Sequence, residues 1–258
     1  MKTTIMYHTI AKQIMFGFLP YQRAMIYVIA TLCLSSLCDH SKTSNSYFAQ
    51  QNNIFNIYFV KFSWGWTLIS LGVYLLVKSL ITSQNNAFVT DQIKISLKML
   101  MRLLIGTAVW YYGTNAFLIV EDQTGVCGVP KHLDKNSCRR NGFFWNGFDI
   151  SGHCFLLVWC NLVITEEVQA SYSKNIPERY LHKEKNLEVG DNKFSKIDIL
   201  FCFLSFLTVM WDVMITCTNM FFHTTCEKFL GTTIAVLCWA FLYNFIYKTY
   251  LSKWLSLK

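Results

Sequence analysis

Long apolar runs are the dominant pattern in this sequence of 258 residues. Residues 103–120 and 229–247 contain no charged residue, and residues 54–77 and 199–226 contain one each. A helix needs about 20 apolar residues to cross the roughly 30 Å hydrocarbon core of a bilayer. The pattern therefore predicts an all-α, polytopic membrane protein.

Six transmembrane helices are expected, and because no internal repeat is visible, residues 1–258 are expected to form one membrane domain. The predicted spans are residues 22–38, 56–79, 101–120, 149–168, 198–221 and 229–248. The first is the shortest apolar run, and the core of a signal peptide is its alternative interpretation.

Lys and Arg predict the orientation of these spans. With the N-terminus in the cytosol, the cytosolic segments carry roughly twice as many Lys and Arg residues as the opposite ones, as the positive-inside rule requires. Both termini and loop 169–197 are then cytosolic, and loop 121–148 is lumenal. The formal net charge of +8 is thus explained by topology and by anionic lipid headgroups, and no nucleic-acid module is present.

Composition supports the same class of protein. Apolar residues make up 53% of the chain and charged residues 15%, against roughly 25% charged in soluble domains. Eight of the ten cysteines lie in or beside apolar spans. Cys127 and Cys138 lie in the lumenal loop, where they are either bridged or free thiols.

Two of the six histidines stand out. His8, His40, His132 and His182 lie in polar segments and are expected to be ordinary surface residues. His153 lies about one turn inside the start of the fourth span and His223 at the last turn of the fifth, so the predicted topology places both at the lumenal face. Either one alone is more simply an interfacial histidine bonded to backbone or water. Together they are a candidate catalytic pair.

Phosphoryl transfer suits two imidazoles at a lipid–water boundary. One nitrogen can carry a phosphoryl group while the other protonates the leaving group. Glu227, one helical turn after His223, could orient its imidazole if the helix continues, while Asp149 and Ser151 are interpreted as helix caps. Cations near these residues could hold phosphate oxygens, although contact with lipid headgroups explains each one as well. They are Lys131, Lys135, Arg139, Arg140 and Lys228.

The remaining polar features suggest less. The nearest possible zinc ligands lack metal-site spacing, so no cofactor is expected, and assistance by a divalent metal is left open. Asp212 lies near mid-membrane, where it either pairs with Lys61 or Asn161 or stays protonated. A small transporter centred on Asp212 is the weakest functional hypothesis, because the spans show no two-fold repeat.

Several motifs together resemble the fat storage-inducing transmembrane (FIT) family of the endoplasmic reticulum membrane, which is similar to lipid phosphate phosphatases. They are NIYFVKFSWGWT at 56–67, GFFWNGFDISGHCFLL at 142–157, NLVITEE at 161–167 and the FFH…EKFLGT segment at 221–232. The resemblance implies six spans, cytosolic termini and cleavage of the diphosphate bond of fatty acyl-CoA. It assigns His153 as the general acid and His223 as the nucleophile. It also implies neutral-lipid binding and roles in lipid-droplet formation and endoplasmic reticulum lipid homeostasis.

The sequence departs from the phosphatases at the phosphate-binding positions. Their K-x6-R-P motif is absent, and Cys217 stands where their third motif has arginine. Glu227 replaces their aspartate, which keeps the charge on a longer side chain. A non-enzymatic protein that binds triacylglycerol or diacylglycerol and partitions it into droplets is the alternative function. Such a protein would need apolar spans but neither histidine.

Overall fold

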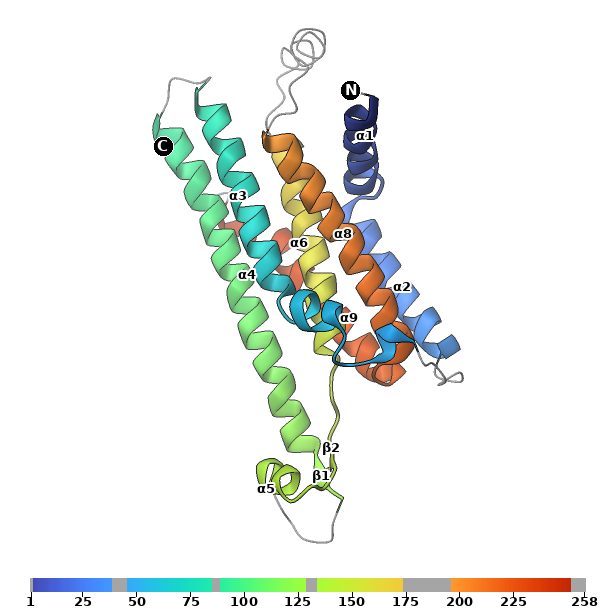
Figure 1. The fold of residues 1–258 in the computed structure, drawn as a ribbon. Coiled ribbons are helices and arrows are strands. Elements are labelled where there is room, and N and C mark those ends of the chain that lie inside the picture. The colour runs from blue at the N-terminus through green and yellow to red at the C-terminus, as the bar shows by residue number, and fades with distance from the viewer. Residues whose placement is uncertain (1, 39–45, 85–88, 129–133, 174–195, 252–258) are drawn as a thin grey trace.

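The computed structural model describes residues 2–38, 46–84, 89–128, 134–173 and 196–251. The long helices are α1 (Lys2–Phe16), α2 (Pro20–Cys38), α3 (Ser63–Gln84), α4 (Val89–Thr124), α6 (Gly152–Ser173), α8 (Lys196–Phe221) and α9 (Thr225–Ala240). The short elements are η1 (Tyr47–Ala49), the π-helices η2 (Phe55–Val60) and η3 (Phe241–Leu251), α5 (Lys135–Arg140), and strands β1 (Val126–Cys127) and β2 (Trp145–Asn146). The prediction of an all-α polytopic membrane protein is confirmed (Figure 1).

Five of the described helices are long and apolar enough to cross a membrane. They are Pro20–Cys38, Leu100–Thr124, Gly152–Tyr172, Lys196–Phe221 and Thr225–Tyr247, and each matches a predicted span. The other predicted span, residues 56–79, folds as η2, a turn and then α3. Since α3 is not among the five, the count of six stays a prediction. Most of the predicted cytosolic loop, together with His40, His132, His182 and Lys131, lies outside the described residues.

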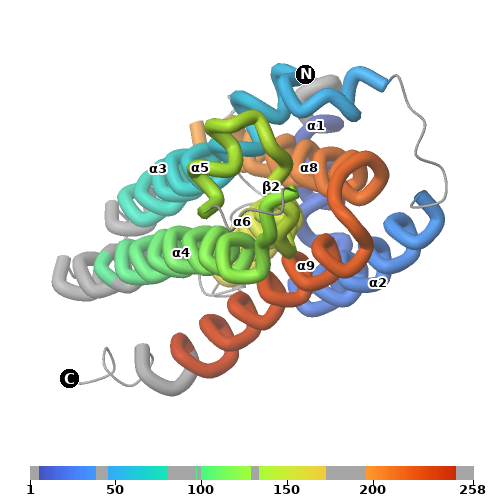
Figure 2. Tube along the Cα trace, turned by 90° about the horizontal axis from the view of Figure 1, so that it is seen from below, coloured from blue at the N-terminus to red at the C-terminus, as the bar shows by residue number. Residues whose placement is uncertain are grey.

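Helix α6 forms the centre of the bundle. Seen from the end that carries β1, β2 and α5, it is surrounded by α2, α3, α4, α8 and α9 (Figure 2). In the apolar, membrane-length segment of α6, 78% of the residues are buried, whereas in that of α4 only 11% are. Most residues of α6 are apolar or small and they occur on all its sides, which is typical of a helix buried all round. Helix α6, whose first turn carries His153, is therefore the most buried of the membrane-length helices described.

A polar cluster lies inside the bundle around Asp212. One carboxylate oxygen, Oδ1, accepts hydrogen bonds from Tyr27 Oη at 2.7 Å and from Asn161 Nδ2 at 2.8 Å. Asn161 is thus confirmed as a partner of Asp212, whereas Lys61 lies at the end of η2 and its backbone N–H donates to Asn56. These bonds join α2, α6 and α8. Polar groups inside a membrane need such partners, because leaving them unpaired in hydrocarbon costs free energy.

Residues 121–128 and 134–149 form a small extension at one end of the bundle, which we call the hairpin end (Figure 1). β1 and β2 pair antiparallel, with Cys127 opposite Trp145. A disulfide joins Cys127 to Cys138 in α5, so the bridged alternative is the one found. A two-stranded hairpin is marginal alone, and the bridge ties it to α5 beside the last turn of α4.

Candidate functional site

His153 lies in the first turn of α6. Ser151 caps this helix, since its Oγ accepts a hydrogen bond from the N–H of Cys154 at 3.3 Å. The backbone N–H of Ser151 donates to the carbonyl oxygen of Glu227 at 3.1 Å, which ties the start of α6 to the first turn of α9. The predicted role of Ser151 as a cap is confirmed.

His223 lies in the link between α8 and α9, two residues beyond the end of α8 at Phe221. The prediction that His223 lies in the last turn of the fifth span is therefore wrong by two residues. Its φ of 55° is left-handed, a conformation uncommon for residues other than glycine. This conformation turns the chain from α8 into α9. The His223 side chain is 18% exposed.

Glu227 connects His223 to both helix starts. Its Oε2 accepts a hydrogen bond from the N–H of Thr224 at 2.8 Å, which completes the capping box of α9. Its Oε1 accepts from the N–H of Asp149 at 3.2 Å. His223 Nδ1 lies 3.8 Å from Oε2. The expected contact between these residues exists, although a capping box produces it rather than an unbroken helix.

Asp149 adds a second carboxylate, which the sequence reasoning interpreted only as a cap. Its Oδ2 lies 3.6 Å from His223 Nδ1, and its side chain is 56% exposed. Partial burial raises the pKa of Asp149 and outweighs the positive charge of His223, which acts in the opposite direction. Nδ1 of His223 therefore faces two carboxylates, and a protonated Nδ1 leaves Nε2 as the basic nitrogen.

The two imidazoles lie close enough to interact electrostatically, and His153 interacts in the same way with Lys61. The bundle thus brings His153, His223 and Glu227 together at the hairpin end, as the sequence indicated. Lys61 was missed at this site, because it was considered only as a partner of Asp212. The signal was present: the second predicted span starts at the same face as the fourth, and Lys61 lies near its start.

The predicted cation clamp is organised differently. Lys135 Nζ and Arg139 Nη2 pair with the two carboxylate oxygens of Glu121 at 2.7 and 3.1 Å. Lys228 is buried and donates to the carbonyl oxygen of Asn219 at 2.8 Å, across the end of α8. Arg140 is exposed on α5. Three of the five cations thus hold the protein together.

Within the described ranges, no group of three or more His, Cys, Asp or Glu side chains is arranged to hold a metal ion. The site consists of imidazole, carboxylate and ammonium groups at the end of a membrane bundle. Such groups can carry out nucleophilic and acid–base chemistry on an anionic substrate.

Comparison with known proteins gives a consistent picture. The family model described as fat storage-inducing transmembrane protein (FIT) matches residues 44–122 and 119–243. A Xenopus laevis protein is 37% identical over 220 residues, covering 83% of this chain and 77% of its own. A human protein is 35% identical over 228 residues (85% and 80%), and one from Danio rerio is 32% identical over 245 residues (88% and 86%). All three are named acyl-coenzyme A diphosphatase FITM2.

No solved structure matches the chain. The matched residues include both histidines, Glu227 and Lys61, so the family match covers the whole candidate site as well as most of the bundle. By this match, and by relatives more than 30% identical over most of both chains, the protein belongs to the fat storage-inducing transmembrane family.

Proposed function

We propose that this chain is a fatty acyl-CoA diphosphatase. The observation that carries the proposal is the name acyl-coenzyme A diphosphatase, shared by relatives that match the chain along most of its length. The grouping of two imidazoles and two carboxylates at one end of the bundle supports it, because these groups suit phosphoryl transfer.

In the first step of the proposed mechanism, Nε2 of His223 attacks one phosphorus of the diphosphate. The P–O bond to the bridging oxygen breaks, and His153 donates a proton to the departing phosphate. Asp149 and Glu227 stabilise the positive charge that develops on His223, since both carboxylates face Nδ1. A phosphorylated histidine carrying half of the substrate remains.

In the second step, water attacks the phosphorus of this intermediate while the now neutral His153 accepts a proton from it. The P–N bond breaks and frees His223. Overall, acyl-CoA and water give acyl 4′-phosphopantetheine and adenosine 3′,5′-bisphosphate. The mechanism uses side chains of this chain and water, with no cofactor.

The place of the site in the bundle fits an amphipathic substrate. The imidazoles lie where the membrane-length helices α6 and α8 meet the polar hairpin end. An acyl chain can stay in the bilayer while the diphosphate reaches the histidines. From the distribution of Lys and Arg we propose cytosolic termini and a lumenal site. We further propose location in the endoplasmic reticulum membrane, with roles in lipid-droplet formation and lipid homeostasis.

Purified wild-type protein, His153→Ala and His223→Ala should be assayed on oleoyl-CoA, with both products identified by mass spectrometry. His8→Ala is the matched control, because His8 pairs with Asp198 on α8, away from the site. We expect hydrolysis by the wild type and the control, and a loss of roughly 10³-fold or more in each site variant. No hydrolysis by the wild type would eliminate the proposed function, and equal hydrolysis by all four proteins would eliminate the roles of His153 and His223.

Neutral-lipid binding is the further property that the family resemblance implies, and it requires neither histidine. Binding of labelled triacylglycerol, measured on the same proteins, separates the two functions. Variants that lose hydrolysis but keep lipid binding would show that both properties reside in one bundle.

A further inference from the structure

Lys61 occupies a braced turn at the hairpin end of α3. It directly follows η2, and its N–H donates to the carbonyl oxygen of Asn56 at 3.1 Å. Val60 before it is 1% exposed, whereas Lys61 itself is exposed. The last residue of η2 is thus buried against the bundle, and the lysine that follows it lies outside the core.

Several contacts fix this turn. The indole Nε1 of Trp66 donates to the carbonyl oxygen of Tyr58 at 2.9 Å, and the rings of Trp66 and Phe59 stack at 5.8 Å. The amide of Asn56 donates to the carbonyl oxygen of Gln51 at 2.7 Å. Lys61 therefore extends from a rigid part of the fold, which reduces the entropy lost when it binds a ligand.

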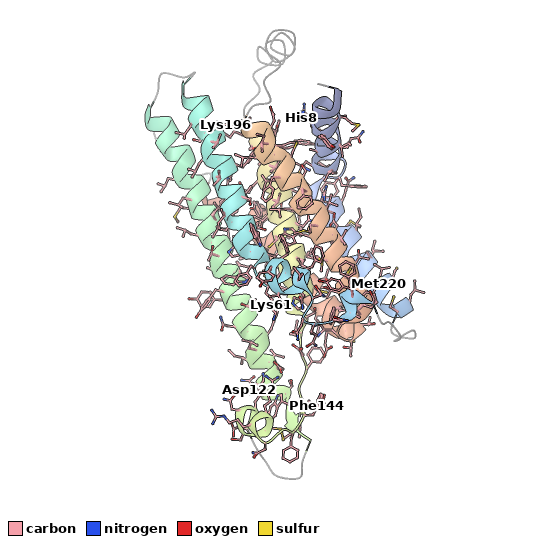
Figure 3. The ribbon with its side chains drawn as sticks, in the orientation of Figure 1. His8, Lys61, Asp122, Phe144, Lys196 and Met220 are labelled. Carbon is pink, nitrogen blue, oxygen red and sulfur yellow. A yellow bond between two sulfur atoms is a disulfide. The ribbon has the colours of Figure 1, made fainter. Side chains whose placement is uncertain are left out.

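The position of Lys61 relative to His153 gives it a possible role. η2 and α3 both contact α6, and the side chains of Lys61 and His153 interact electrostatically. Figure 3 shows Lys61 at the base of α3, on the side of the molecule toward the hairpin end and far from His8 and Lys196. A positive charge that acts on the imidazole of His153 suits the binding of an anion there.

Three other cations of the described residues at this end are engaged. Lys135 and Arg139 neutralise Glu121, and Lys228 holds the end of α8. A diphosphate brings negative charge that needs cationic donors in the ground state and still more in the transition state.

We propose that Lys61 binds the phosphate oxygens of the substrate next to His153. This proposal rests on the proposed function, since a diphosphate is the anion in question. Lys61 would hold the phosphate that His223 attacks. The oxygen that leaves this phosphate would then lie within reach of the proton on His153. A lysine at a membrane boundary can also contact the phosphate of a lipid headgroup, so the test must separate the two sources.

The test compares Lys61→Met, Lys61→Arg and wild type in a phospholipid-free neutral detergent. Lys196→Met is the control, because Lys196 is also exposed but lies at the opposite end (Figure 3). The probe is a palmitoyl-CoA analogue whose bridging diphosphate oxygen is replaced by a methylene group, with binding measured by calorimetry. kcat and KM for palmitoyl-CoA and thermal unfolding complete the comparison.

Loss of one charge-assisted contact should weaken binding of the analogue by roughly 10- to 100-fold in Lys61→Met. Lys61→Arg should keep most of the affinity, Lys196→Met all of it, and every variant should unfold at the temperature of the wild type. Equal affinity of wild type and Lys61→Met, or a difference that appears only in phospholipid vesicles, would overturn the proposal. Tight, Lys61-dependent binding without hydrolysis would support Lys61 while refuting the proposed function.

Discussion

Gly231 is the contact point between the two helix starts that build the site, and its substitution should disturb stability and catalysis together. A Cβ atom added at Gly231 would lie 2.4 Å from the carbonyl oxygen of Ser151 and 3.4 Å from the backbone nitrogen of Phe155. The first distance is far inside normal contact, and backbone cannot move aside as a flexible side chain would. Gly231→Ala should therefore push α9 away from the start of α6.

The size of the effect follows from two opposing terms. Overpacking of this kind costs about 1–3 kcal/mol, while replacing glycine by alanine inside a helix gains about 1 kcal/mol. Gly65→Ala isolates the second term, because nothing lies within 4 Å of the Cβ position at Gly65 in α3. For a chain of this size, 1 kcal/mol shifts Tm by about 2–4 °C. Gly231→Ala should thus melt roughly 2–12 °C below Gly65→Ala.

Catalysis should respond more strongly than stability. The backbone hydrogen bond from Ser151 to Glu227 sets the position of His153 relative to His223. Displacing one catalytic group from the other by about 1 Å can cost roughly 10²-fold in rate. Thermal unfolding in detergent and kcat on acyl-CoA should be measured on both variants. If Gly231→Ala matches Gly65→Ala in Tm and kcat, the close approach of α6 and α9 does not set the site geometry.

Three further changes test other parts of the account. Replacing Cys127 and Cys138 together by serine should lower the free energy of unfolding by about 3 kcal/mol, because the bridge joins residues 11 apart, and denaturant titration measures this loss. Glu227→Ala should cost about 0.5–2 kcal/mol through loss of the cap. Glu227→Gln keeps one of the two accepted hydrogen bonds, so it should lose less stability than Glu227→Ala yet lower kcat, since it removes the charge facing His223. The raised pKa of Asp149 means that the folded protein favours the neutral carboxyl group over the carboxylate. The stability that the neutral form contributes is therefore present at low pH and is lost as pH rises through that pKa. Asp149→Asn should therefore raise Tm relative to wild type at pH 8, and a Tm gap that fails to shrink on acidification would contradict the burial argument.

The membrane architecture was predictable because its cause is local. An apolar run of about 20 residues folds as a spanning helix whatever its neighbours are, so five spans and the shared end of His153 and His223 followed from the pattern alone. Cys127 and Cys138 could be nominated as a pair for the same reason, since one short loop contains both.

The details of the site depend on contacts that no local pattern encodes. The capping box at Thr224 starts α9 directly after His223, and this places His223 in a left-handed link rather than in the last turn of α8. Glu121 occurs in the sequence as an unremarkable acidic residue, yet it neutralises Lys135 and Arg139. These pairings follow from how the helices meet in space.

Tyr27 is a residue inside the bundle whose contact likewise could not be predicted from the sequence. Asn161 could be named as a partner of Asp212 because both are polar residues at mid-span. Tyr27 bonds to the same carboxylate, but tyrosine is common in membrane helices, and nothing in the sequence indicates which face of α2 meets α8.

The most direct test of the central claim is a search for a covalent intermediate on His223. Wild-type protein mixed with excess acyl-CoA should be quenched within milliseconds in alkali, digested and mapped by mass spectrometry. The account predicts half of the substrate attached through a P–N bond to His223, stable in alkali and lost in acid, and absent from His223→Ala. Rapid turnover with an unmodified His223, or an adduct on His153 instead, would contradict it.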